Sequence, residues 1–165
     1  MKSKKVGKKI FLVLIVLVFL ALAVNIVYAK RVTKINFSKV TTSSSDSAFH
    51  TIGIAHEVIF KSGWSIEGEG GILFLSEQGG ATLIPSLTVK KYIESTLPLE
   101  FWLGGGIGVM FEGFFFSASV GSKWLLGKAI TIEPFLRLNY YALMLPLEML
   151  PHGLGFSLGL GIGIR

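Results

Sequence analysis

The chain has 165 residues, of which 20 are glycine, 13 are phenylalanine and none is cysteine, and 51% are hydrophobic. This length suits a single domain, and the lack of cysteine excludes disulfides, a thiolate nucleophile and a cysteine-ligated metal. The formal net charge of +6 does not indicate nucleic-acid binding, because five of the 16 basic residues lie within the first nine positions and the others form no patch.

The first 29 residues have the pattern of a secretory signal. Lysines at positions 2, 4, 5, 8 and 9 precede an unbroken apolar run over 10–24, and Val27-Tyr28-Ala29 supplies acceptable residues before a cleavage site. The pattern predicts cleavage after Ala29, which leaves a mature chain of 30–165. The alternative is an uncleaved anchor helix, because the apolar character extends to Val27 and approaches the length of a membrane span. The mature chain has nearly balanced charge, with 11 basic and 10 acidic residues.

Apolar and polar residues alternate through the mature chain, which is the two-residue period of a β-strand. In SGWSIEGEGGILFL, Trp64 and Ile66 share one face while Glu67 and Glu69 share the other. Eight strands are expected from the alternation. They lie at 31–41, 49–60, 64–75, 81–91, 97–110, 114–124, 129–142 and 154–165. An even number suits a closed antiparallel meander.

Two architectures fit this alternation, and the composition of the polar face separates them. A soluble barrel or sandwich would bury the apolar face, whereas a transmembrane barrel would turn it toward lipid. Glycine dominates the polar face of several strands, as in LGLGIGIR, and only 21 of the 136 mature residues are charged, fewer than a soluble surface needs. The sequence therefore predicts an all-β fold, an eight-stranded antiparallel up-and-down transmembrane β-barrel over 30–165, preceded by a signal helix over 1–29.

The glycines are expected beside inward aromatic side chains. If consecutive strands pair, Gly108 neighbours the strand of Phe115, and Gly159 neighbours the strand of Phe135. The rings would then lie flat over bare backbone. Alternatively, glycine permits the strong coiling of a small barrel, and the sequence leaves both interpretations open.

The export signal, the alternating strands of about ten residues, the aromatic strand ends and the strand at the C-terminus together resemble the small eight-stranded outer-membrane barrels of the OmpA-like and OmpX-like class. The resemblance is one of pattern over the mature chain. It implies an outer-membrane location, contact with outer-membrane lipid and insertion by the barrel-assembly machinery. Such barrels usually end in an aromatic residue that this machinery reads, whereas this chain ends in Ile164-Arg165.

Charged residues on the inward face are predicted to form a network in the lumen. Its members are Glu57, Glu67, Glu69, Glu100, Lys123, Glu133, Arg137 and Arg165, with Lys34 as a further inward base. A narrow interior holds charges that are paired and hydrogen-bonded, which predicts a lumen plugged by side chains. The alternatives are a relay for protons or ions and a paired-acid site at Glu67 and Glu69.

No catalytic constellation stands out in the sequence. His50, His56 and His152 lack metal-ligand spacing, no serine lies in a nucleophile elbow, and no helix start follows the glycine runs as in a phosphate loop. We expect no cofactor, no metal site and no enzymatic activity, so a lipid-modifying outer-membrane enzyme is the least favoured function.

Two features concern the membrane surface. Aromatic residues near strand ends are predicted to form interfacial belts: Trp64, Tyr92, Trp124, Tyr140 and Tyr141. The apolar segment 143–153, LMLPLEMLPHG, is predicted either to bind a protein or surface ligand or to fold over the barrel mouth. The sequence thus predicts a structural, adhesion or envelope-interaction role, with a narrow channel or transporter for protons or small solutes as the alternative.

Overall fold

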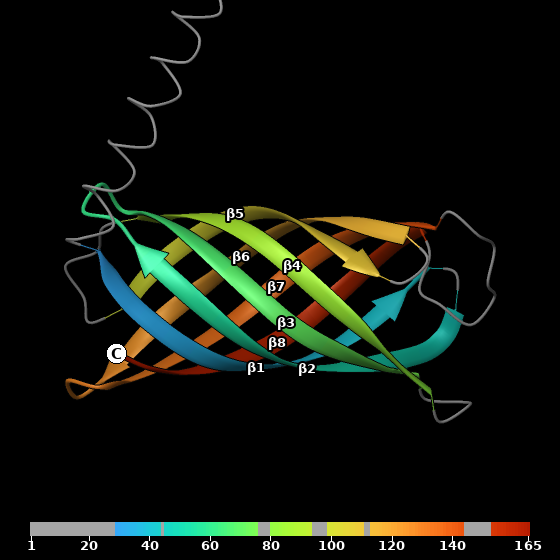
Figure 1. Cartoon of the computed structure of the whole chain (residues 1–165), viewed down its shortest axis with the longest axis horizontal. Helices are drawn as coiled ribbons and strands as arrows, with labels where there is room; N and C mark the ends of the chain where they lie inside the picture. The colour runs from blue at the N-terminus through green and yellow to red at the C-terminus, as the bar shows by residue number, and fades with distance from the viewer. Residues whose placement is uncertain (1–28, 44, 76–79, 94–98, 111–112, 144–152) are drawn as a thin grey trace, which may run out of the picture.

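A computed structural model of the protein describes residues 29–43, 45–75, 80–93, 99–110, 113–143 and 153–165. They form eight antiparallel strands that pair in chain order, and β8 closes the barrel against β1 (Figure 1). The strands are β1 (Lys30–Thr42), β2 (Ser45–Ile59), β3 (Trp64–Leu75), β4 (Gly80–Ile93), β5 (Leu99–Met110), β6 (Gly113–Leu126), β7 (Ile130–Leu143) and β8 (Gly153–Ile164). The predicted eight-stranded antiparallel barrel is confirmed.

The strand limits differ from the predicted ones by a few residues. The largest difference is at β2, which begins at Ser45 instead of at 49, because its backbone continues to pair with β1 up to Thr42 opposite Ser45. The register shifts between Thr41 and Thr42, so this extension lacks the clean alternation from which the other strands were predicted.

The two ends of the barrel differ in their connections. Both barrel termini lie at one end together with the β2–β3, β4–β5 and β6–β7 connections, and the other four connections lie at the opposite end (Figure 1). We call these the terminal end and the loop end. At the terminal end, Gly63 and Gly127 adopt φ values of 75° and 69°, which suit glycine in tight turns.

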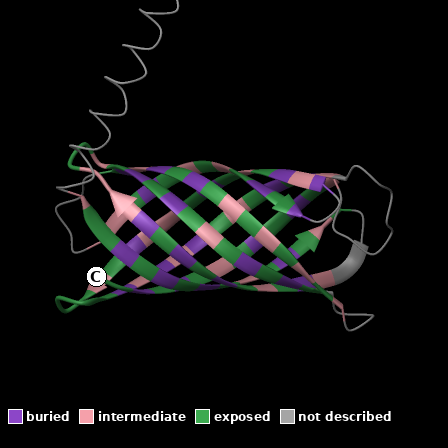
Figure 2. Ribbon diagram, in the orientation of Figure 1, coloured by how far each residue is buried: buried purple, intermediate pink, exposed green. Residues whose placement is uncertain are grey.

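Burial alternates along every strand (Figure 2). Outward apolar side chains are exposed, such as Leu83 at 70% and Leu158 at 67%, whereas the inward Glu57 and Thr131 are fully buried. This inside-out distribution is the one that lipid requires, and strands of 12 to 15 residues are long enough to cross a bilayer.

Two predicted features fall outside the described residues. Positions 1–28 and 144–152 are not described, so cleavage of a signal after Ala29 and ligand binding by segment 143–153 stay predictions. Within the described part of the chain, no helix is long and apolar enough to cross a membrane.

Glycines make room for inward aromatic rings. A Cβ atom on Gly108 would overlap the ring of Phe115, and one on Gly159 would overlap the ring of Phe135. Gly121 of β6 stands in the same relation to Trp102 of β5. These contacts support the interpretation in which rings lie over bare backbone, where a larger residue could not fit.

Candidate functional site

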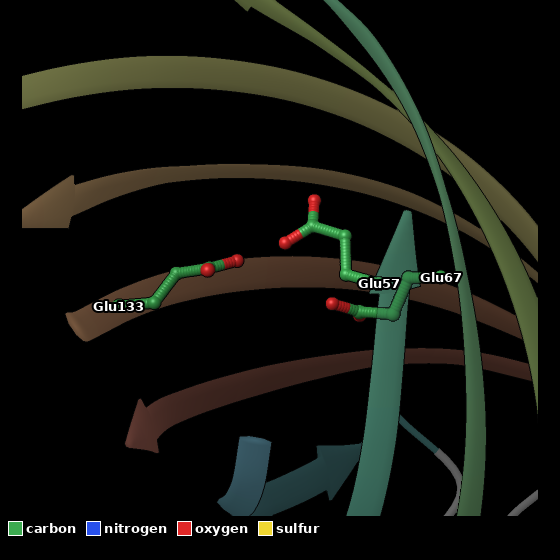
Figure 3. Close-up of side chains that lie close together, drawn as sticks. All are labelled: Glu57, Glu67 and Glu133. Carbon is green, nitrogen blue, oxygen red and sulfur yellow. The ribbon is translucent and has the colours of Figure 1, made fainter. Parts of the chain in front are cut away.

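Six charged side chains from six strands meet inside the terminal half of the barrel. We call this group the ion-pair cluster. Its three carboxylates converge from β2, β3 and β7 (Figure 3), and no side chain in the cluster is more than 2% exposed. Three positive charges face three negative charges, so the cluster is neutral when all are ionised. Its members are Lys34, Glu57, Glu67, Lys90, Lys123 and Glu133.

Two lysines bridge the carboxylates across the lumen. The Nζ atom of Lys34 lies 3.1 Å from Glu57 Oε2 and 2.9 Å from Glu133 Oε2, and it also pairs with Glu67. The Nζ atom of Lys90 lies 2.7 Å from Glu67 Oε2 and 2.7 Å from Glu133 Oε1. Each lysine thus binds two or more carboxylates, and the strands that carry them are tied together across the barrel axis.

Neutral groups complete the hydrogen bonds of Glu57. The hydroxyls of Ser65 and Tyr92 each donate to Glu57 Oε1 at 2.7 Å. Lys123 Nζ donates to Glu57 Oε2 at 2.9 Å and to Tyr92 Oη at 2.6 Å. Both oxygens of this fully buried carboxylate are therefore satisfied, which is the condition for holding a charge away from water.

The strand register explains why the ion-pair cluster needs positively charged side chains. Glu57 and Glu67 are direct cross-strand partners on β2 and β3, and like charges in that position destabilise a sheet. Lys34 of β1 and Lys90 of β4 reach these carboxylates from the two strands that flank the β2–β3 pair, and the bare β8 leaves room for the stem of Lys34. A Cβ atom on Gly163 would lie 2.7 Å from Lys34 Cγ, and one on Gly161 would lie 3.6 Å from Glu133 Cβ. The glycines near the end of the chain thus leave space for the charged side chains.

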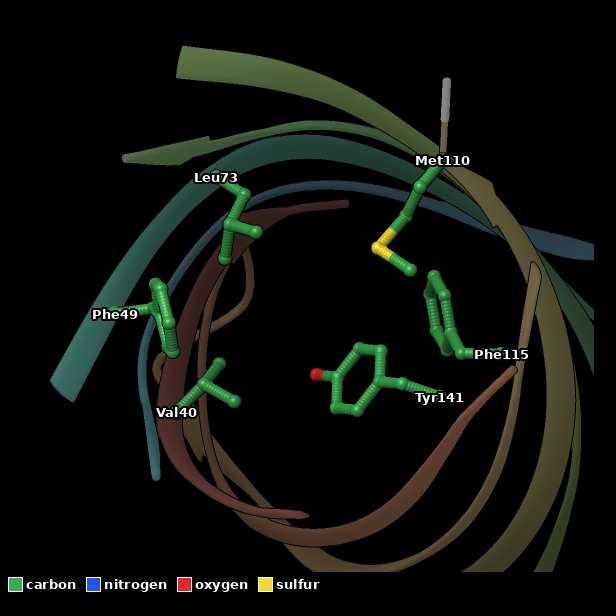
Figure 4. Packing of buried hydrophobic residues seen from close by; sticks show 6 residues of the cluster. All are labelled: Val40, Phe49, Leu73, Met110, Phe115 and Tyr141. Atoms are coloured by element: carbon green, nitrogen blue, oxygen red, sulfur yellow. The ribbon is translucent and has the colours of Figure 1, made fainter. Parts of the chain in front are cut away.

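An apolar layer lies in the loop half of the interior (Figure 4). Its side chains come from six strands and are at most 7% exposed, and the rings of Phe115 and Tyr141 lie 5.5 Å apart between centroids. We call it the loop-end apolar layer, and its members are Val40, Phe49, Leu73, Met110, Phe115 and Tyr141.

A small cavity of about 20 Å³ lies between the loop-end apolar layer and polar side chains that include Glu69, Arg137 and Asn139. Arg137 Nη2 lies 3.7 Å from Glu69 Oε2. Among the described residues, Glu69 Oε2, Arg137 Nε and Asn139 Oδ1 have no hydrogen-bond partner. A cavity of this size and polarity suits one water molecule.

The structure brings together only part of the predicted lumen network. Glu57, Glu67, Lys123 and Glu133 meet in the ion-pair cluster, whereas Glu69 and Arg137 form a separate pair. Two residues of the predicted network do not join either group. Glu100 of β5 is half-buried and is the cross-strand partner of Lys123 of β6. Lys123 binds Glu57 and Tyr92 instead of Glu100. Arg165 is exposed at the terminal end, where its N–H donates to the Ala129 carbonyl at 2.9 Å.

One member of the ion-pair cluster was missing from the predicted network. Lys90 alternates with Thr88 on the polar face of β4, and both are buried. Position along the strand was therefore a sufficient signal that Lys90 points inward. Its Nζ also lies 4.2 Å from the centroid of the Trp102 ring, a cation–π contact that a sequence alone does not reveal.

The predicted interfacial aromatics divide into two groups. Trp64, Trp124 and Tyr140 point outward and are 49%, 50% and 55% exposed. The prediction of an interfacial position is wrong for Tyr92 and Tyr141, because both point into the lumen and are 7% exposed. Each lies two residues after an inward polar side chain, so strand alternation overrides proximity to a strand end.

The sequence matches no protein-family model and no curated protein. Among solved structures, the fold is similar to Neisserial surface protein A, with a TM-score of 0.63 and 8% identity over 82% of this chain and 95% of that chain. It is also similar to the N-terminal β-barrel domain of Pseudomonas aeruginosa OprF, with a TM-score of 0.57 and 11% identity over 82% and 98%. A de novo designed transmembrane β-barrel gives a TM-score of 0.53 and 6% identity over 80% and 94%. The chain thus has the fold of the small eight-stranded outer-membrane barrels.

Proposed function

We propose that this protein is an integral outer-membrane barrel with a lumen closed by side chains, and that its role is structural, adhesive or otherwise concerned with envelope interactions. The ion-pair cluster is the observation that carries this proposal. A solute that moved along the axis would have to separate lysines from carboxylates to which they are bound at 2.7–3.1 Å. Breaking a buried pair costs about 3–5 kcal/mol.

The loop-end apolar layer adds a second barrier in series. A hydrated ion that passed the ion-pair cluster would meet six apolar side chains in the loop half of the interior. An apolar constriction excludes water and therefore opposes ion passage. The interior is thus closed by charge pairing in one half and by apolar packing in the other.

The outer-membrane location is supported by three features. The barrel turns apolar side chains outward on every strand, the sequence begins with a signal-like segment, and a similar fold occurs in Neisserial surface protein A. Outer-membrane lipid and the barrel-assembly machinery are then its proposed partners during insertion, and segment 143–153 is the proposed binding segment for a protein or surface ligand.

Passage of protons or small solutes is the second candidate function. It is favoured by the small cavity beside Glu69 and Arg137 and by the hydrogen-bonded chain from Lys123 through Tyr92 to Glu57. It ranks lower because the loop-end apolar layer offers no polar group other than the Tyr141 hydroxyl. An enzymatic role has less support, since His50 and His56, the histidines within the described residues, lie on the outer face.

Recordings in planar bilayers test the closed lumen. The folded wild-type protein is expected to give no steady conductance, while its migration on gels shifts with boiling, as a folded barrel requires. Steady ohmic conductance from a heat-modifiable preparation would establish a channel and refute the closed lumen. N-terminal sequencing of the membrane-bound form checks the export step: a start at Lys30 is expected, and an intact Met1 would favour the anchor helix.

A further inference from the structure

One charged side chain and one histidine interrupt the apolar outer surface at the loop end. Lys39 of β1 and His50 of β2 are direct cross-strand partners, and both are exposed on the outer face. Their neighbours in the same row are Leu158 of β8 and Phe74 of β3. Among the residues whose side chains the structure describes, Lys39 is the only charged one on the outer face in the loop half of the barrel.

The two side chains have no partner within the barrel. Neither Lys39 nor His50 makes a hydrogen bond or an ion pair with another described residue. By contrast, His56, the other outward histidine of β2, lies 3.2 Å from the hydroxyl of Thr33. A lysine on the lipid-facing surface is destabilising unless it reaches the interface or meets an anion. Lys39 and His50 are therefore placed to bind a group that belongs to the surroundings.

Their depth suits the headgroup region of one leaflet. Lys39 lies three residues before Thr42, where β1 ends, which is about 10 Å along the strand. A lysine stem can extend from that level toward the membrane surface. Cβ atoms of cross-strand partners are about 5 Å apart, so a single phosphate group can accept hydrogen bonds from both the ammonium and the imidazole.

An apolar groove continues from this pair across the outer face. It has a volume of about 660 Å³ and crosses from β3 through β2, β1 and β8 to Pro134 of β7. The row next to Lys39 and His50 on the side away from the loop end is wholly apolar, since Pro134, Leu160, Phe37 and Ile52 are successive cross-strand partners. A cationic end followed by an apolar floor matches the chemistry of a lipid with a phosphate headgroup and an acyl chain.

We propose that this groove binds one anionic phospholipid, with its phosphate held by Lys39 and His50 and an acyl chain lying along Phe37, Leu160 and Pro134. The proposal goes beyond the proposed function but rests on its membrane location. The charge of the pair selects a lipid over a second copy of the chain, because apposing two copies of this face would bring cationic groups together. Such a lipid would order one side of the barrel and neutralise the charge on its lipid-facing surface.

Native mass spectrometry of the full mature protein tests the site. The protein is folded into vesicles of phosphatidylcholine alone or with phosphatidylglycerol, extracted in mild detergent and examined for retained lipid. We expect one phosphatidylglycerol on the wild type and little phosphatidylcholine. The Lys39→Ala/His50→Ala double variant should lose retention about tenfold or more, the size of effect expected from removing about 1.4 kcal/mol of binding. Lys39→Arg should retain the lipid, since it keeps the charge.

Lys128→Ala is the matched control, because it removes one positive charge from the exposed β6–β7 turn, outside the groove. It should retain phosphatidylglycerol as the wild type does. The proposed site would be refuted if the double variant retained as much phosphatidylglycerol as the wild type, or if the wild type retained the two lipids equally. It would also be refuted if the wild type formed a dimer that the double substitution dissociated. Heat-modifiable migration checks folding of each variant. Insertion without lipid preference would refute this site alone, whereas failure to insert into any vesicle would also refute the membrane location.

Discussion

Lys34 is the residue whose removal tests most directly whether the ion-pair cluster stabilises the barrel. Its ammonium pairs with Glu57, Glu67 and Glu133, and its side chain is 1% exposed. Substitution by Met keeps an unbranched stem of similar length beside Gly163 and removes the ammonium group with its charge and its hydrogen bonds. A loss of stability in Lys34→Met is therefore attributed to the ammonium group and its pairs, and not to packing of the stem.

The expected loss follows from the charge count. In Lys34→Met, three buried carboxylates share the two remaining lysines, so one negative charge lacks a counterion. Removing one partner of a buried pair costs about 3–5 kcal/mol. Adding Glu67→Gln restores neutrality, and Glu67 is the suitable partner because Glu57 also binds Ser65 and Tyr92. The double variant should recover at least half of the loss, with a coupling of about 1–3 kcal/mol between the two sites.

Equilibrium urea unfolding in vesicles, followed by tryptophan fluorescence and by gel migration, measures these free energies. Lys128→Met is the control, because Lys128 is exposed in a turn and its loss should change stability by no more than about 0.5 kcal/mol. The reasoning fails if Lys34→Met is no less stable than this control. It also fails if the effects of Lys34→Met and Glu67→Gln simply add.

Two further substitutions test the two faces of the strands. Gly159→Ala should destabilise the barrel by about 1–3 kcal/mol, because its Cβ would overlap the Phe135 ring. Gly68→Ala is the control and should be near neutral in the same unfolding assay, because its Cβ meets open space. Equal effects of the two substitutions would show that the ring contact is unimportant. Leu103→Arg, at an outward position that is 55% exposed, should cost about 2–4 kcal/mol in vesicles, and a cost no larger than that of Leu103→Ala would contradict its contact with lipid.

The barrel could be predicted from the sequence because alternation fixes both strand position and face. A slip of one residue would turn every apolar side chain of a strand into the lumen, so the register is strongly determined. The same rule explains the correction at Tyr92 and Tyr141. Proximity to a strand end predicts a position at the membrane surface for both tyrosines, yet each lies on the same strand face as an inward neighbour, Lys90 or Asn139, and is buried.

The partners within the lumen could not be predicted in the same way. Cross-strand register places Lys123 opposite Glu100, and that neighbour would be the natural choice from the sequence. In the barrel, Lys123 instead reaches Glu57 of β2, a strand that is not its neighbour in the sheet. Contacts across the axis depend on barrel closure and on which side chains leave space, and neither follows from the order of residues along one strand.

The ion-pair cluster and the loop-end apolar layer contribute differently to the stability of the barrel and to closure of its lumen. The ion-pair cluster ties six strands together by charge, whereas the loop-end apolar layer packs side chains of six strands without ion pairs. Loss of one lysine therefore weakens the fold while leaving the apolar layer in place. The reverse holds for truncation of an aromatic side chain in the loop half, after which the lysines still cross the axis. Under the proposed closed lumen, the ion-pair cluster and the apolar layer each oppose ion passage, so a single substitution is expected to lower stability without creating a channel.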